Sequence, residues 1–264
     1  MAFEDLKQRQ ATMWGSAPFE RIAPLIGAMH DELVVQLDPQ PGERWPDLAC
    51  GAGDVAFRAA RAGADVTASD ISPTLVEAAR RRAADEHLEL TLEVADCEHL
   101  PYADGSFDAV SSSVGVIFAP DHARVASELA RVCRAGGRLG LTAWRASSGA
   151  GEMFRRMAPF MPPPVEGAGS PLAWGDEAYV EEMLGDAFEL EFLERDVPYT
   201  GDDAEEMWAV FRDNFGPVFT LRASLDEKRR AALDRTMIEQ LEEARGPDGI
   251  RSERLYLLAL GVRR

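Results

Sequence analysis

Asp47-Leu48-Ala49-Cys50-Gly51-Ala52-Gly53-Asp54 is the stretch that decides the fold, and Asp70 follows 17 residues beyond Gly53. Apolar residues precede the glycines and a helical pattern over 54–62 follows them, so the glycines occupy a turn from a strand into a helix. Glycine lets a ligand approach the backbone closely, and the N–H groups that begin the helix face an electron-rich group. Asp70 follows the next predicted strand, over 64–69, where a carboxylate can accept hydrogen bonds from a pair of ribose hydroxyls. These residues indicate a nucleoside site.

Short apolar runs alternate with helical patterns over 43–145, which is typical of repeated βα units and a mostly parallel sheet. The glycine turn also fits the dinucleotide pattern G-x-G-x-x-A, so by itself it does not separate NAD from S-adenosylmethionine. Pro46 lies inside the first run and removes a ladder donor, so either the strand begins near Asp47 or Pro46 faces an unpaired position. We predict strands over 44–49, 64–69, 88–95, 107–114 and 138–144, a helix after Ser72 as N-cap, and a helix from Asp121 that Gly136-Gly137 ends.

The flanking regions have a different character. Residues 3–37 predict two helices, and the chain after Arg145 begins with a loop-rich connection. Ser224-Leu225-Asp226-Glu227 has the form of a capping box that opens a helix. The remaining predictions are a short helix near 153–160, a helix over 176–184, a strand over 187–197, two helices within 202–245 and a final apolar strand over 253–262.

Further motifs narrow the choice of cofactor. Asp96-Cys97 follows the third strand, Asp104-Gly105-Ser106-Phe107-Asp108 leads into the fourth, and Ala135-Gly136-Gly137-Arg138 leads into the fifth. Together with the glycine turn they resemble the class I S-adenosylmethionine-dependent methyltransferases, in particular the group that includes the ubiquinone/menaquinone-biosynthesis C-methyltransferases. The resemblance is strong over 45–145 and elsewhere extends only to the layout.

The resemblance implies an α/β fold, a Rossmann-like, doubly wound sheet of seven strands whose last strand is antiparallel. It also implies an N-terminal helical cover and a helical lid inserted between strands six and seven. We therefore expect one methyltransferase domain over 1–264. Its parts are a cover over 1–42, a cofactor-binding core over 43–145, a substrate and lid region over 146–250 and the final strand over 251–264.

S-adenosylmethionine is the cofactor that the resemblance implies. Gly51 and Gly53 would lie against its methionine part, and Asp47 would hold its amino group. Ser113, or Ser112 beside it, would face the sulfonium and the substrate.

The nucleoside part of the cofactor has its own residues by the same resemblance. Asp70 would take the ribose hydroxyls, and Ile71 would stack on the adenine. The Asp96 side chain and the Cys97 backbone would meet the adenine edge. Ala49 stands where the family often has a first glycine, which costs the turn some freedom.

Methyl transfer from a sulfonium needs alignment and the exclusion of water, and it needs a base only when the acceptor carries a proton of high pKa. His122, just after the fourth strand, is the candidate base, although it also reads as an exposed residue in the first turn of a helix. His30, in the N-terminal helices, is a second candidate. His87 and His99 are expected at the surface, and no metal site is predicted.

Aromatic residues outside the cofactor core suit a small, largely apolar acceptor, although most of them are expected to be ordinary core. The segment between Trp208 and Phe219 places several in the predicted lid. The residues predicted to line the acceptor pocket are Trp14, Phe19, Phe118 and Trp144.

Charge and composition limit the partners. The chain has 46 acidic and 28 basic residues, a net charge of -18, which argues against nucleic acid and anionic membranes. No window of about 18 apolar residues predicts a membrane span. The N-terminus lacks an apolar signal core, and three cysteines (Cys50, Cys97 and Cys133) fit a reducing cytoplasm. We expect a cytoplasmic monomer or homodimer with a small-molecule acceptor.

Residues 146–250 hold 23 acidic and 10 basic residues, a net of -13. This acidity is either a set of solvated helix faces or an acidic mouth that steers a cationic amine. The sequence thus predicts a methyltransferase that acts by in-line displacement. The alternative is a catalytically idle protein that binds S-adenosylmethionine or another nucleoside, and a nicotinamide-dependent oxidoreductase is a third reading.

Overall fold

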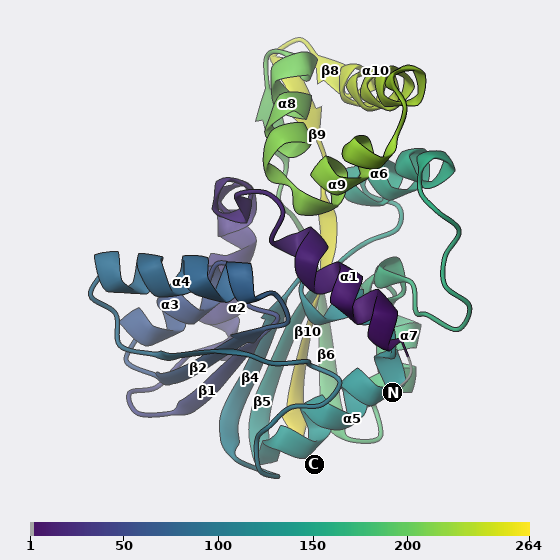
Figure 1. The fold of residues 1–264 in the computed structure, drawn as a ribbon. Helices are drawn as coiled ribbons and strands as arrows, with labels where there is room; N and C mark the ends of the chain where they lie inside the picture. The colour runs from purple at the N-terminus through teal and green to yellow at the C-terminus, as the bar shows by residue number, and fades with distance from the viewer. Residues whose placement is uncertain (1–2) are drawn as a thin grey trace.

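A seven-stranded sheet forms the centre of the protein in a computed structural model, which describes residues 3–264 (Figure 1). The strand order is β3-β2-β1-β4-β5-β10-β6. β10 pairs antiparallel with β5 and β6, whereas the first five strands pair in parallel, so the predicted Rossmann-like sheet is confirmed. The strands are β1 (Arg44–Leu48), β2 (Asp65–Asp70), β3 (Thr91–Val94), β4 (Phe107–Ser113), β5 (Cys133–Trp144), β6 (Phe188–Asp196) and β10 (Leu255–Arg263).

Helices cover the two faces of this sheet, and alternate residues of the strands belong to two different cores (Figure 1). Leu258 of β10 belongs to the core that α2, α3 and α4 cover, whereas its neighbour Leu257 belongs to the core that α5 and α7 cover. In α5 the predicted apolar spacing is confirmed, since Val125, Leu129 and Val132 are buried. The helices are α2 (Gly27–Leu37), α3 (Asp54–Arg61), α4 (Pro73–Asp85), α5 (His122–Val132) and α7 (Glu177–Leu184).

Residues 197–254, here called the insertion, lie between β6 and β10 as predicted for the lid. They hold three helices where the sequence predicted two, because Phe215 is extended and Pro217 then starts a new helix. Figure 1 shows the insertion above the sheet, with α1 (Glu4–Trp14) between them. The elements of the insertion are β7 (Tyr199–Gly201), α8 (Ala204–Asn214), α9 (Gly216–Ser224), α10 (Glu227–Glu243), β8 (Arg245–Gly246) and β9 (Gly249–Ser252).

The predicted capping box is wrong. Ser224 is the last residue of α9, and its hydroxyl donates to the Leu221 carbonyl. Asp226 is the N-cap of α10 instead, and its carboxylate accepts the N–H of Arg229 at 2.8 Å. An aspartate is as good an N-cap as a serine, so the helix begins where the extended backbone places a carboxylate.

Two details of the core also differ from the prediction. α5 ends at Val132 and not at Gly136-Gly137, because Cys133 already pairs with Phe107 and becomes part of β5. β1 begins at Arg44, so Pro46 lies inside it, but β1 pairs with β4 only through Asp47. On that side Pro46 interrupts no ladder.

The other flanking elements follow the prediction closely. Residues 3–37 contain α1 and α2, joined by two short 3-10 helices, and α6 (Gly149–Met157) lies near the helix expected at 153–160. Among the helices within residues 3–264, none combines the length and the apolar character that crossing a membrane requires.

Candidate functional site

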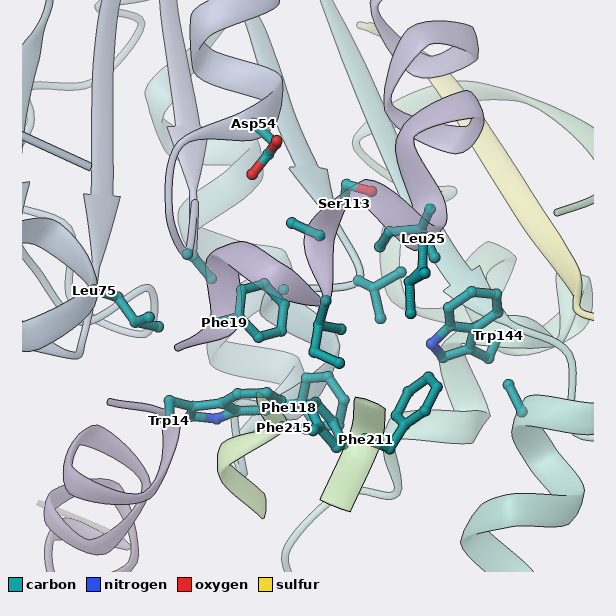
Figure 2. Close-up of a pocket in the computed structure, with 18 of the residues that line it drawn as sticks. Trp14, Phe19, Leu25, Asp54, Leu75, Ser113, Phe118, Trp144, Phe211 and Phe215 are labelled. Carbon is teal, nitrogen blue, oxygen red and sulfur yellow. The ribbon is translucent and has the colours of Figure 1, made fainter. Parts of the chain in front are cut away.

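One cavity runs from the glycine turn to the insertion (Figure 2). Its cofactor end is defined by Asp47, Gly51, Asp70, Ile71, Asp96 and Cys97, and its insertion end by Tyr199, Phe211, Phe215, Gln240, Ser252 and Arg254. Of the predicted site residues, Ser113, Trp14, Phe19, Phe118 and Trp144 also line it, whereas Gly53, Ser112 and His122 do not.

The glycine turn is shaped by left-handed backbone conformations. Gly51 has φ +56° and Gly53 φ +90°. A Cβ on Gly53 would lie 2.7 Å from the Phe57 ring, and one on Gly51 would lie 3.3 Å from the Phe19 ring. Gly53 therefore lets the turn pack closely against Phe57, while Gly51 borders the cavity. Ala49 adopts φ 51°, a left-handed conformation that is strained for a residue with a Cβ. This strain is the cost expected at a position where the family often has glycine.

Asp70 joins the glycine turn to α4. Its Oδ2 accepts the N–H of Gly51 at 2.9 Å, and its Oδ1 accepts the N–H of Ser72 at 2.8 Å. Ser72 holds the predicted N-cap position, although its own hydroxyl has no partner within residues 3–264. Burial raises the pKa of the Asp70 carboxyl. Each oxygen keeps a lone pair for a ligand hydroxyl.

Asp47 is a second buried carboxylate beside the cavity, with 1% of the residue exposed. It accepts the Ser111 hydroxyl at 2.9 Å and the N–H of Ala56 at 3.1 Å. Burial raises the pKa of Asp47 to about 7, and the carboxylates of Asp54 and Asp70 add to the effect. No ion pair of Asp47 or Asp70 is formed within residues 3–264. The two carboxylates fit a ligand that brings positive charge and hydroxyl donors, as S-adenosylmethionine does.

Asp96 is held from the N-terminal helix. Lys7 of α1 donates to Asp96 Oδ2 at 2.6 Å and to Glu98 Oε2 at 3.0 Å, and its side chain is buried. Asp96, Glu98 and His99 place ligand atoms within 4.8 Å of one another, but the Lys7 ammonium already pairs with both carboxylates. The contact closes α1 over the cofactor end.

Aromatic side chains line the cavity between its two ends (Figure 2). The Trp14 ring lies 4.8 Å from Phe118, 5.6 Å from Phe215 and 6.1 Å from Phe19, measured between centroids. Phe118 in turn lies 6.2 Å from Phe154 of α6. Four separate regions of the chain thus build one apolar wall, which suits an apolar ligand.

Comparison with known proteins agrees with this geometry. Residues 46–141 match the Methyltransferase domain family. An uncharacterized protein of Mycobacterium tuberculosis (strain ATCC 25618 / H37Rv) is 33% identical over 241 residues, which cover 89% of this chain and 88% of the relative. The ubiquinone/menaquinone biosynthesis C-methyltransferase of Zymomonas mobilis is 31% identical over 149 residues, 52% of this chain and 62% of that protein.

The chain belongs to the class I S-adenosylmethionine-dependent methyltransferase family. The fold is also that of the crystal structure of geranyl diphosphate C-methyltransferase from Streptomyces coelicolor A3(2), in complex with Mg²⁺, geranyl diphosphate and S-adenosyl-L-homocysteine. The TM-score is 0.56 at 16% identity, over 90% of this chain and 77% of that one.

The two candidate bases of the methyltransferase have different surroundings. His30 of α2 lines the cavity, is 5% exposed, and its Nδ1 has no partner within residues 3–264. Burial lowers the pKa of His30 to about 4, so the ring is neutral at physiological pH. His122 is 4% exposed, lies 2.7 Å from the Tyr179 hydroxyl through Nδ1, and packs on Trp174. The structure thus brings His30, and not His122, to the cavity.

The alternative prediction, that His122 is an exposed residue in the first turn of a helix, is wrong. His122 begins α5, but Gly169 lies so close that a Cβ there would be 2.4 Å from the His122 ring. Burial lowers the pKa of His122 as well. The predicted surface positions of His87 and His99 are confirmed.

Sequence motifs did not identify the polar residues of the insertion end. Tyr199, Gln240, Ser252 and Arg254 belong to separate elements or follow them, and none stands in a recognisable pattern. None of the acidic residues of 146–250 lines the cavity. The acidity of this region therefore does not form a mouth for a cationic amine.

Proposed function

We propose that this methyltransferase moves the methyl group of S-adenosylmethionine to a small, largely apolar acceptor. The observation that supports the proposal is the continuous cavity, in which the carboxylates of Asp47 and Asp70 lie at one end and an aromatic wall follows. The cofactor supplies a methyl group activated by a positively charged sulfur. An electron pair of the acceptor forms the new bond to the methyl carbon, and the pair of the broken carbon–sulfur bond stays on sulfur.

The residues of the protein hold the cofactor and enclose the reacting atoms. Asp70 receives the ribose hydroxyls and Asp47 the amino group, while Ile71, Asp96 and Cys97 surround the adenine. Gly51 and Ser113 border the space around the sulfur, and Gly53 shapes the turn. Alignment and the exclusion of water are the main sources of rate. The aromatic residues that exclude water are Trp14, Phe19, Phe118 and Trp144.

His30 is the group that receives the proton of an acceptor hydroxyl or amine. Its Nδ1 is buried and unpartnered, and the neutral ring can accept a hydrogen bond from the acceptor. A pKa of about 4 makes it a weak base, so it contributes most where the acceptor proton is itself acidic. His122 is too enclosed by Tyr179 and Trp174 for this role.

Titration calorimetry with S-adenosylhomocysteine and a methyl-transfer assay test the proposal together. We expect micromolar binding and transfer of methyl label to at least one member of a pool of small apolar acceptors. Absence of binding would overturn the cofactor assignment. Binding without transfer to any acceptor would instead favour the catalytically idle alternative.

A further inference from the structure

Arg254 is a buried cation without an acidic partner. It lies between β9 and β10, lines the insertion end of the cavity and is 7% exposed. Within residues 3–264 no carboxylate oxygen lies within 4.0 Å of its guanidinium, and the guanidinium donates no hydrogen bond. A buried charge normally has a partner, because leaving it unpaired is costly.

Asp196, the acid that contacts the Arg254 backbone, is already engaged. Asp196 accepts the backbone N–H of Arg254 through Oδ1 at 2.9 Å, and it accepts the side chain of Arg251 through Oδ2 at 2.8 Å. The Arg254 guanidinium instead lies 4.4 Å from the Tyr199 ring centroid and 4.8 Å from that of Phe211. The two rings hold its position, but they leave its N–H donors in the guanidinium plane free.

A shortage of acids does not explain this arrangement, since acidic residues outnumber basic ones by 46 to 28. Lys7, the other basic side chain that lines the cavity, has two carboxylate partners. Burial lowers the pKa of Arg254 to about 10, so it stays protonated at neutral pH. The insertion end thus offers one positive charge to a ligand.

Other polar groups gather beside Arg254. Gln240 of α10 donates to the Gly149 carbonyl at 2.9 Å, while its Oε1 is buried without a partner within residues 3–264. The N–H of Gly149 donates to the carbonyl of Glu253 at 2.8 Å, and a Cβ on Gly149 would lie 2.5 Å from the Ser252 hydroxyl. Gly149 therefore brings the Gln240 side chain next to the segment that carries Arg254.

A row of rings connects this polar group to the cofactor end. Phe211 packs on the Arg254 guanidinium, the Phe215 ring lies 6.0 Å from Phe211, and the Phe19 ring lies 6.4 Å from Phe215. Phe19 in turn borders Gly51. Figure 2 shows Phe19, Phe215 and Phe211 along this part of the cavity. An acceptor that reaches from the sulfur to Arg254 must be apolar along most of its length.

We propose that the acceptor of this methyltransferase carries a carboxylate that binds Arg254, with an apolar body along Phe211 and Phe215 and the methylated atom at the cofactor end. The inference rests on the proposed function and names the acceptor class for the same cavity. A single guanidinium matches a single negative charge and pairs with a carboxylate through two parallel hydrogen bonds. Carboxylates at the cofactor end, among them Asp47 and Asp70, repel an anion there and so orient the acceptor.

Calorimetry on the protein saturated with S-adenosylhomocysteine tests the proposal. The probes are phenylacetate and decanoate, each beside its primary amide, with phenyl phosphate and decyl phosphate as the other anions. We expect a carboxylate to bind at least about tenfold more tightly than its amide, and Arg254→Met to remove the difference. Arg251→Met is the matched control, because Arg251 is an exposed arginine paired to Asp196, and it should keep the preference.

Equal binding of acids and amides, or a preference that survives Arg254→Met, would overturn the proposal. Tighter binding of the phosphates than of the carboxylates would overturn the choice of carboxylate. These outcomes are distinct from a failure of the proposed function, which shows as lost S-adenosylhomocysteine binding in the unaltered protein.

A stability measurement separates ligand binding from a structural role. Removing an unpaired buried charge should leave the Tm of the ligand-free protein unchanged or raise it in Arg254→Met. A clear fall in Tm would mean that Arg254 serves mainly to support Tyr199 and Phe211, and it would contradict the proposal.

Discussion

The two ends of the cavity differ in charge and in origin. The cofactor end presents the carboxylates of Asp47 in β1, Asp70 at the end of β2 and Asp96 just after β3, all within a short stretch of chain. The insertion end presents aromatic rings and one unpaired guanidinium, from elements spread over residues 199–254. The site proposed for the cofactor thus depends on local backbone geometry, whereas the site proposed for the acceptor depends on long-range packing.

The largest expected effect is at Asp70. Asp70→Ala removes the proposed acceptor of the ribose hydroxyls and leaves the N–H groups of Gly51 and Ser72 without their acceptor. We expect the Kd for S-adenosylhomocysteine to rise about 100-fold, since hydrogen bonds to a charged group are worth roughly 1.5–3 kcal/mol each. Calorimetry measures it, and Asp65→Ala, exposed at the start of the same strand, is the control. A rise of less than about threefold in Asp70→Ala would contradict the assignment.

Substitution of His30 is expected to have the second largest effect. His30→Gln should lower kcat about tenfold for an acceptor with a dissociable proton, below the usual range for a general base because its pKa of about 4 makes it weak. His122→Gln should leave kcat unchanged and lower stability by about 1 kcal/mol through the lost contact with Tyr179. Steady-state kinetics and urea unfolding check the pair, and equal kcat values for the two variants would refute the role of His30.

A substitution at Phe215 tests whether the insertion end binds the acceptor. Phe215→Leu keeps the site apolar but shortens the wall beside Trp14 and Phe211, so we expect KM for the acceptor to rise about threefold to fivefold with unchanged cofactor affinity. Phe219→Leu, at an exposed position of α9 close to Phe215 in the sequence, should change neither. A matching loss of cofactor affinity in Phe215→Leu would show that the two ends are not independent.

Substitution of Asp47 is expected to have the smallest effect, a change in thermal stability that depends on pH. The pKa of Asp47 is raised to about 7 by burial, so the folded protein binds this proton more tightly than the unfolded chain does. The stability that Asp47 contributes is therefore present at low pH and is lost as the pH rises through about 7. Asp47→Asn should raise Tm by a few degrees at pH about 8.5 and by less at pH about 5. Thermal unfolding without ligand measures this, and a gain that is larger at the lower pH would contradict it.

Local patterns predicted the backbone of the glycine turn and the position of Asp70. Gly51 and Gly53 have positive φ angles in a turn that few other residues can make, and Asp70 stands at the end of the next strand. The parallel strands and the antiparallel β10 followed from the same order of motifs. Helix boundaries could not be read from local patterns alone, since the end of α5 depends on pairing between Cys133 and Phe107 and not on the nearby glycines.

The family, the sheet and the glycine turn with its neighbouring acids could be predicted from the sequence, because these depend on residues close together in the chain and on backbone conformations that only some residues adopt. Tertiary structure alone decided that His30 lines the cavity while His122 is enclosed, and that Arg254 lies buried without an acid. Whether a charge is paired depends on groups that the fold brings together from distant elements. No local pattern encodes such a long-range pairing, and so the end of the cavity proposed for the acceptor could be recognised only in the folded protein.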